Sequence, residues 1–402
     1  MKRYGSLLRV PGVARLLFSQ LLARFPGGML SLGLILHIEA RYDSYGSAGL
    51  VLAGLSVGQA VSGPLTSRWM GRWGMRPVLI LTTAVCAVAL VVIALVPLEL
   101  GVTVAVALLA GLSYPPIQPA VRTIYPKMVN STQLTPLYSL DATAQEVIWV
   151  TGPVLVTFVG TQVSTELAIM LSVLFLVAGG IWFISSPELG RVRIPRSKRR
   201  FGAVLARPVV LLTTVVGLLL VGGFSAIETA VVATFGDHGA EAGIVLGIWS
   251  IASLIGGLAL GHSPITPWSM ARRLGLIAAG SILAIAAFDF WTLTGALVIA
   301  GFCIAPALTV MFAVVSASVR FSDTAEAYGW VGTGQLIGAA VGSAIAGFVI
   351  DGVGADGGLW VASGMLVLGT LIAVVFRRAI PDLRGRDASP IPDTEPVPTQ
   401  PS

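Results

Sequence analysis

Twelve apolar stretches, each about as long as a bilayer is thick, constrain this chain more than any other feature. A helix needs about 20 mostly apolar residues to cross the hydrocarbon core. Only 11% of the residues are charged, against about 25% in a soluble protein. The sequence therefore predicts an all-α integral membrane protein with twelve transmembrane helices. The expected spans are residues 13–38, 47–67, 77–97, 101–121, 136–160, 165–185, 208–234, 240–260, 271–291, 293–317, 325–350 and 357–377.

The basic residues gather in every second segment between these spans. If the N-terminus is cytoplasmic, every one of the 25 Lys and Arg residues except Arg24 and Arg41 falls in or beside a cytoplasmic segment. An excess of Lys and Arg in cytoplasmic loops orients membrane proteins. We therefore expect both termini in the cytoplasm, and we interpret the net charge of +6 as an orientation signal rather than a sign of nucleic-acid binding. Arg far outnumbers Lys, which favours a GC-rich bacterium and hence the bacterial cytoplasmic membrane.

A long basic segment divides the chain into two groups of six spans. The expected organisation is a first half at 1–187, a linker at 188–207, a second half at 208–378 and a tail at 379–402. The tail is rich in proline with few apolar residues, so we expect it to be disordered on the cytoplasmic side.

Pairs of matching residues relate the two halves. Tyr138 matches Tyr328 and Gln145 matches Gln335 at the same spacing along the chain. Six spans return the chain to the same side of the membrane, so the halves form a parallel repeat. Such repeats place the substrate path at their interface, near the middle of the bilayer.

The segment that follows the second span carries the most recognisable motif. It reads GPLTSRWMGRWGMRPVL from Gly63, and it resembles the signature loop of the major facilitator superfamily, whose core is Asp-Arg-x-Gly-x-Arg. Arg72, Gly74 and Arg76 match this core, and the resemblance implies that they form a gating loop with Gly63. Gly71 stands where the family has the acid that helps to latch the halves at the cytoplasmic face, which leaves the latch of this chain undefined. Without the resemblance, Arg72 and Arg76 would also be explained as basic residues of a cytoplasmic loop that orient the protein in the membrane.

The fifth span carries a second, shorter resemblance. Its segment from Trp149 to Pro153 is similar to the Gly-Pro centre of a motif found in proton-coupled drug exporters of the superfamily, although the flanking glycines are absent. This resemblance favours export. Proline removes a helix hydrogen bond and permits a kink. The expected kink positions are Pro26, Pro116, Gly152, Pro153 and Pro306.

Ionisable residues within the spans are the main candidates for function, because a charge at the centre of a membrane helix costs about 2.5–3.5 kcal/mol on insertion scales. Arg24 is expected to face the central cavity, where it binds an anionic group or pairs with an acid. Glu146 and Glu228 are candidates for carrying a coupling proton, since burial favours the neutral form of a carboxyl group. A structural hydrogen bond remains open for both acids. Gln145 and Gln335 are further candidates for lining the cavity.

Other polar residues have plainer interpretations. Asp141 lies early in the fifth span and is expected to pair with a cytoplasmic Arg, with Arg72, Arg76 and Arg122 as candidates. Asp323 and Glu326 have the spacing of a helix capping box. The three histidines are scattered and both cysteines lie in apolar runs, so the sequence indicates no metal site and no disulfide.

These features favour a secondary transporter that moves a small molecule by alternating access. We expect proton-coupled efflux of drug-like compounds or metabolites by a monomer in the lipid bilayer, without a cofactor. The sequence has no nucleotide-binding loop and no motif of a nucleophilic or zinc enzyme, so we expect neither ATP-driven transport nor an enzyme. The alternatives are an importer of sugars or organic anions, and a membrane scaffold or sensor without transport.

Overall fold

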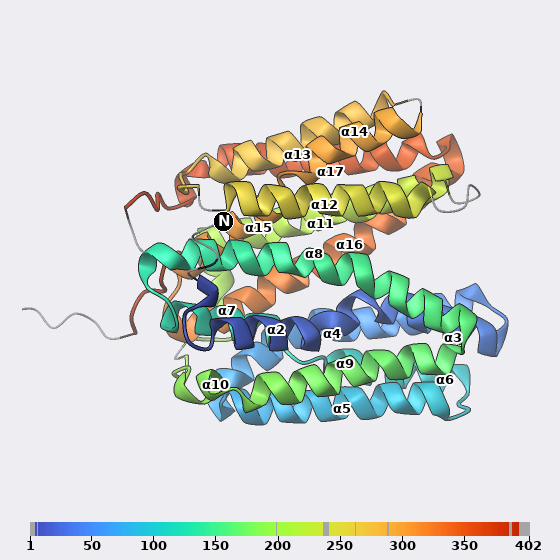
Figure 1. Ribbon diagram of the computed structural model, residues 1–402, viewed down its shortest axis with the longest axis horizontal. Coiled ribbons are helices and arrows are strands. Elements are labelled where there is room, and N and C mark those ends of the chain that lie inside the picture. Colours follow the sequence, from blue (N-terminus) through green and yellow to red (C-terminus); the bar gives the residue numbers. More distant parts are fainter. Residues whose placement is uncertain are drawn as a thin grey trace, which may run out of the picture.

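The computed structural model describes Gly5 and residues 7–197, 199–235, 241–261, 263–287, 289–385 and 388–393. Lys2, Arg3, Lys198, His238, His262 and Arg386 fall outside these residues. Within them, all named elements are helices, and the one β-bridge joins Arg320 to Ile391. The long helices run side by side along one direction (Figure 1).

The first six spans are built from eight α-helices and two short 3-10 turns. They are α2 (Val13–Arg24), η1 (Phe25–Gly28), α3 (Leu30–Tyr42), α4 (Tyr45–Trp73), α5 (Met75–Leu95), α6 (Leu100–Leu112), α7 (Ile117–Ile124), η2 (Tyr125–Lys127), α8 (Ser131–Gln162) and α9 (Thr165–Ser185). The connecting segment contains α10 (Pro187–Arg191) and η3 (Ala203–Ala206).

The last six spans follow the same plan. They contain α11 (Pro208–Phe235), α12 (Glu241–Leu260), α13 (Ser269–Ile285), α14 (Phe290–Gly301), α15 (Ile304–Ser318), η4 (Phe321–Asp323), α16 (Thr324–Val353), α17 (Asp356–Val375) and η5 (Arg377–Ala379). In Figure 1 the first group of spans lies below and the second group above.

Eleven helical stretches of the described chain are long and apolar enough to span a membrane. The ninth expected span is α13, which has 17 residues and falls just short of that length, yet it packs with α14 and α17 inside the bundle. The boundary between it and the next span is a turn rather than a continuous helix. Asp289 caps α14 through a hydrogen bond from the Thr292 N–H, and this bond lowers the pKa of the Asp289 carboxyl. The expected all-α membrane fold with two six-helix halves is confirmed.

Three spans are interrupted near prolines. The first span changes to a 3-10 turn around Pro26, the fourth is interrupted before Ile117 at Pro116, and the tenth breaks just before Pro306. The fifth span differs, because α8 continues without interruption through Gly152 and Pro153. Gly152 packs directly on the backbone of Gly28, so a Cβ there would meet the Gly28 carbonyl carbon at 3.0 Å. The role of this glycine in the structure is close helix packing.

The beginning of the C-terminal tail is ordered, contrary to the expectation of disorder for 379–402. The N–H of Ile391 donates to the Val319 carbonyl at 2.9 Å, and its own carbonyl accepts from the Phe321 N–H at 3.0 Å. A short apolar segment is thus held by backbone hydrogen bonds, which a composition argument does not anticipate. Residues 394–402 lie outside the described chain.

Candidate functional site

The two halves touch where α4 meets α16. The Thr333 hydroxyl donates to the carbonyl of Ala60 at 2.7 Å, and the backbones of Gly63 and Gly329 approach so closely that a Cβ on Gly329 would lie 2.8 Å from the Gly63 carbonyl oxygen. Gly63, expected in the gating loop, thus takes part in the contact between the halves. These contacts lie toward the end of the molecule that carries the N-terminus, α10 and the arginine-rich turns, which we call the basic end (Figure 1).

An ion pair closes the basic end. Arg68 of α4 donates to Glu326 of α16 at 2.7 Å. The Glu326 side chain is nearly buried, and its second oxygen accepts the backbone N–H of Gly202 at 2.8 Å. The two halves and the segment between them therefore meet at one carboxylate. The sequence interpretation missed Arg68 as a cross-half partner, although it lies within the signature segment.

The expected capping box at the start of α16 is wrong. Asp323 stands at the N-cap position, but its side chain caps no backbone N–H. It accepts a hydrogen bond from the Ser197 hydroxyl at 2.6 Å and pairs with Arg199 at 3.6 Å. The nearby linker offers an arginine, and a charged partner binds a carboxylate more strongly than a backbone N–H does. Both acids therefore hold the linker and α4 instead of the helix end.

The signature segment is mostly helical. The α4 helix continues to Trp73, and only Gly74, with φ of +92°, forms the turn into α5. Arg76 donates to the Ser186 carbonyl at 3.2 Å, and Arg72 lies near the ring of its neighbour Trp73. Neither contact crosses to the second half, so among the described residues the ion pair from this segment to the second half is made by Arg68.

A second closure joins α8 to the other half. The hydroxyls of Tyr138 and Tyr328 lie 3.1 Å apart, and the Tyr138 hydroxyl donates to the Arg122 carbonyl. The Tyr328 hydroxyl lies 2.9 Å from the carbonyl of Phe312. Each tyrosine lies 16 positions after the residue whose carbonyl it contacts, and the two tyrosines lie 190 positions apart. The internal repeat therefore relates one contact to the other. The local two-fold axis of the halves therefore passes between the two hydroxyls.

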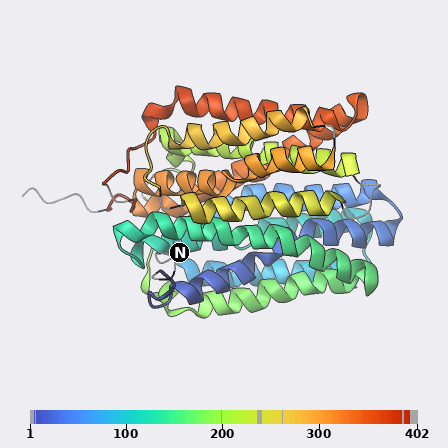
Figure 2. The ribbon, with the colours of Figure 1, turned by 45° about the horizontal axis from the view of Figure 1, so that its top comes forward.

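Beyond this closure, α8 and α12 diverge toward the end opposite the basic end (Figures 1 and 2). Ser139 of α8 still donates to the Gly257 carbonyl of α12 at 2.8 Å, close to the basic end. Further along, Glu146 lies near Ser253 of α12 and within electrostatic range of Glu228 of α11. Glu146 is buried at 9% exposure, whereas Glu228 is exposed. The structure thus brings together both membrane acids, one from each half.

Arg24 lies in a different polar network, inside the first half. It donates to Gln20, to Asp141 at 3.4 Å and to the amide oxygen of Gln145. Asp141 also pairs with Arg122 at 3.0 Å. Arg122 is the one of the three candidate partners that pairs with Asp141. Among the described residues, Arg72 and Arg76 form no ion pair with it. Arg24 is a further partner that the sequence did not indicate.

Gln335, the repeat partner of Gln145, lies on α16 against Gly217 of α11. No described hydrogen bond joins it to the Arg24 network or to the two acids. It is partly exposed, so it remains a candidate for lining the interface rather than a member of either cluster.

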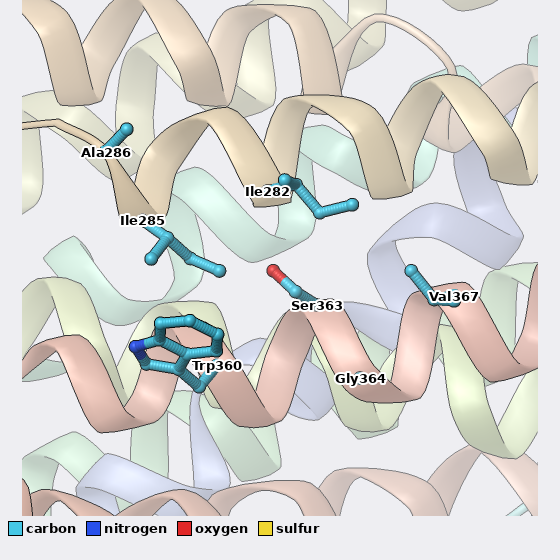
Figure 3. A pocket seen from close by; sticks show the side chains of 7 residues that line it. All are labelled: Ile282, Ile285, Ala286, Trp360, Ser363, Gly364 and Val367. Carbon is cyan, nitrogen blue, oxygen red and sulfur yellow. The ribbon is translucent and has the colours of Figure 1, made fainter.

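An apolar pocket of about 390 Å³ lies between α13 and α17, away from all these groups. Figure 3 shows Ile282 and Ile285 facing Trp360 and Val367, with Ser363 as the polar residue of the wall. Ser363 is hydrogen-bonded to Ser281 at 2.9 Å. The pocket offers no charged group, so the candidate site is the interface that contains the two acids and the Arg24 network.

Comparison with protein families settles the class of the molecule. The profile of the Major Facilitator Superfamily matches residues 16–287 and 267–399, which together span nearly the whole chain. The chain belongs to the major facilitator superfamily. It is therefore a multi-pass membrane transporter of the secondary kind, which binds a small-molecule substrate. No curated protein matches it in sequence.

Solved structures share the superfamily fold at low identity. A bacterial homologue of the iron transporter ferroportin, in an outward-facing state, has a TM-score of 0.75 at 12% identity, covering 90% of this chain and 98% of that one. The human organic anion transporter MFSD10 (TETRAN) has 0.71 at 17%, with coverage of 90% and 98%. The proton:xylose symporter XylE bound to 6-bromo-6-deoxy-D-glucose has 0.70 at 13%, with 94% and 98%.

Proposed function

We propose that this protein is a proton-coupled exporter of drug-like compounds or metabolites in a bacterial cytoplasmic membrane. The observation that carries the proposal is the meeting of Glu146 and Glu228 at the interface. They come from different halves and lie outside the closed basic end. Among the described residues, neither acid takes part in an ion pair.

The surroundings of the acids decide which of them can exchange a proton. Asp141 accepts from two guanidinium groups, so this carboxylate already has charged partners of opposite sign. Among the described residues, Glu146 takes part in no ion pair; Ser253 and the second acid Glu228 lie near it. Two carboxyl groups near each other disfavour double ionisation. We therefore assign the coupling proton to the Glu146–Glu228 pair and a structural charge to Asp141.

The arrangement of the halves supports alternating access. We place the basic end in the cytoplasm, following the distribution of Lys and Arg. The contacts of Arg68 with Glu326 and of Tyr138 with Tyr328 then close the cytoplasmic side, and Glu228 is reached from outside. A similar solved structure is in an outward-facing state, which is consistent with this assignment. Export requires that the cytoplasmic side opens and that the protein takes up substrate there. The protein then closes this side again while a proton is exchanged at the acids.

The test uses inside-out vesicles with a respiratory proton gradient and a pH-sensitive dye. Cationic dyes, antibiotics, sugars and organic acids are added in turn. We expect one class to collapse the gradient with the native protein and no compound to do so with Glu228→Gln. Glu146→Gln is tested beside it, and Glu99→Gln, which changes an exposed acid, is the matched control. Collapse that persists in both acid variants would exclude these residues as proton carriers.

Uptake of an organic anion or a sugar is the second candidate, and the Arg24 network is the observation that favours the anion. A cation at the interface attracts an anionic substrate whichever direction the transport takes. Uptake into right-side-out vesicles separates the two directions. If neither vesicle type shows substrate-dependent flux while the protein is folded, a scaffold or sensor role gains support.

A further inference from the structure

Two guanidinium groups share a single carboxylate in the first half. Arg24 and Arg122 both pair with Asp141, one at each oxygen. Tyr125 and Gln20 also donate to Asp141, at 3.2 Å and 3.1 Å. Four donors saturate the carboxylate, and the network retains one uncompensated positive charge. An uncompensated charge away from water is costly unless a counter-ion joins it.

The accessible part of this network is Arg24 with Gln145. The side chains of Arg122 and Asp141 are 2% and 0% exposed, whereas that of Arg24 is 10% exposed. Gln145 is also partly exposed. The uncompensated charge is therefore reached through Arg24 and not through Arg122.

Several donors of this pair are unused. A guanidinium has five N–H groups. Arg24 uses Nη1 toward Gln20 and Asp141, and Nη2 toward the oxygen of Gln145. Within the described chain, its Nε and the amide nitrogen of Gln145 donate no hydrogen bond to another residue. Both residues are partly exposed, so these donors are available to a ligand.

These donors lie next to the closure between the halves. Gln145 follows Tyr138 by seven residues on α8, which is close to two helical turns, so both project from the same side of the helix. Tyr138 meets the second half through Tyr328. Gln145 thus lies about two turns further out, on the face of α8 that looks toward the interface. Arg24 is held against it from α2.

We propose that Arg24 and Gln145 form a subsite for the anionic group of the substrate, a small organic molecule with one carboxylate or a similar monoanionic group. The inference rests on the proposed transport function and names its substrate class. A guanidinium fork matches a carboxylate with two parallel hydrogen bonds. The single uncompensated charge matches a single negative charge. The Glu146–Glu228 pair lies toward α12 and α11, so the anion and the proton occupy separate places.

The test measures equilibrium binding to the purified full-length protein in nanodiscs, without any transport step. Three probes share one aromatic body and differ in charge: 1-naphthoate, 1-naphthylmethylamine and 1-naphthalenemethanol. Thermal stability is followed as each probe is titrated. We expect stabilisation by naphthoate alone.

Variants locate the binding site. Arg24→Gln is expected to weaken naphthoate binding at least about tenfold, which corresponds to about 1.4 kcal/mol. Arg24→Lys keeps the charge without the fork and is expected to weaken binding less. Gln145→Leu leaves every charge in place and tests the amide donor separately. Arg272→Gln removes the same charge from an exposed position and is expected to leave binding unchanged.

The outcomes are distinct from those of the proton assay. Equal or stronger stabilisation by naphthylmethylamine, no stabilisation by naphthoate, or naphthoate binding unchanged in both Arg24→Gln and Gln145→Leu would overturn the subsite. Binding that depends on Arg24, together with substrate-dependent collapse of the proton gradient in both Glu228→Gln and Glu146→Gln, would leave the subsite standing and refute the coupling. The two proposals therefore fail separately.

Discussion

The two halves share a backbone plan but divide their chemistry unequally. Around the local axis, Tyr138 of the first half and Tyr328 of the second make matching contacts. At the positions related by the same spacing, however, Arg122 corresponds to Phe312 and Asp141 to Val331. The Arg122 guanidinium lies over the Phe312 ring, 3.3 Å from its centroid. The repeat thus preserves packing. Among the described residues, the ion pairs in which both side chains are at most 10% exposed are those of Asp141 in the first half, and the Arg122 cation of that half packs on the apolar Phe312 of the other.

The largest expected effect comes from removing the shared carboxylate. Asp141→Asn leaves two guanidinium groups without a counter-charge, and breaking a buried pair costs roughly 3–5 kcal/mol. We expect a large loss of thermal stability in nanodiscs. Arg24→Gln in the same chain restores the charge balance and is expected to recover part of the loss. Asp382→Asn, which changes an exposed acid, is the control. A small effect of Asp141→Asn would show that the asymmetry of the halves is energetically unimportant.

Opening the ion pair between the halves is expected to have a smaller effect. Arg68→Ala removes a pair whose arginine is 25% exposed, so we expect a shift of about 1 kcal/mol toward states open at the basic end. Distances between spin labels on the ends of α4 and α16 measure this shift. Arg72→Ala, in the same segment but without a cross-half partner, is the control. The exchanged pair Arg68→Glu with Glu326→Arg is expected to restore closure. Unchanged distances in Arg68→Ala would show that this pair does not hold the basic end closed.

The tyrosine pair tests whether the local symmetry is also an energetic symmetry. Tyr138→Phe and Tyr328→Phe each remove a hydroxyl from the closure, and a single hydrogen bond within a membrane protein contributes about 0.6 kcal/mol. We expect similar small losses of stability and a measurable coupling in the double variant. Strongly unequal losses would show that one half dominates the closure despite the matching geometry.

The smallest effect is expected where the superfamily has its acid. Gly71 lies under the linker, and a Cβ there would meet the Pro195 carbonyl oxygen at 3.3 Å. Gly71→Asp therefore places a carboxylate near a carbonyl oxygen and is expected to lower stability slightly, by less than about 1 kcal/mol, without strengthening closure. Tighter closure in the spin-label measurement would mean that the latch follows the usual family pattern after all.

Most of the fold could be read from the sequence, because apolar length and the alternation of arginines act over whole spans. The matching of Tyr138 with Tyr328 in the sequence paired two residues whose hydroxyls meet in the structure, although the sequence did not predict that contact. Helix ends were harder to predict. The α4 helix continues to Trp73, into the expected loop, because arginine and methionine have high helix propensity. The order of the tail near Ile391 rests on backbone hydrogen bonds, which leave no trace in composition.

The candidate site was predictable only one residue at a time. Arg24, Glu146 and Glu228 stood out because charge within a span is costly. Their partners depend on which helix faces pack against each other, and hydropathy does not specify that packing. Glu326 illustrates the difficulty, because its position at a helix start favoured a cap, while a guanidinium from another half supplies a stronger partner.

The linker between the halves has a mechanical consequence of its own. Its Gly202 and Arg199 are bound to the same turn of α16 that receives Arg68. A segment that merely tethers two bodies can be lengthened or cut without affecting their motion. This linker instead contacts both acids at the start of α16, so opening the basic end, as the proposed function requires, would also break the contacts of Gly202 and Arg199. Under that proposal the linker contributes to the energy of opening as well as joining the two halves.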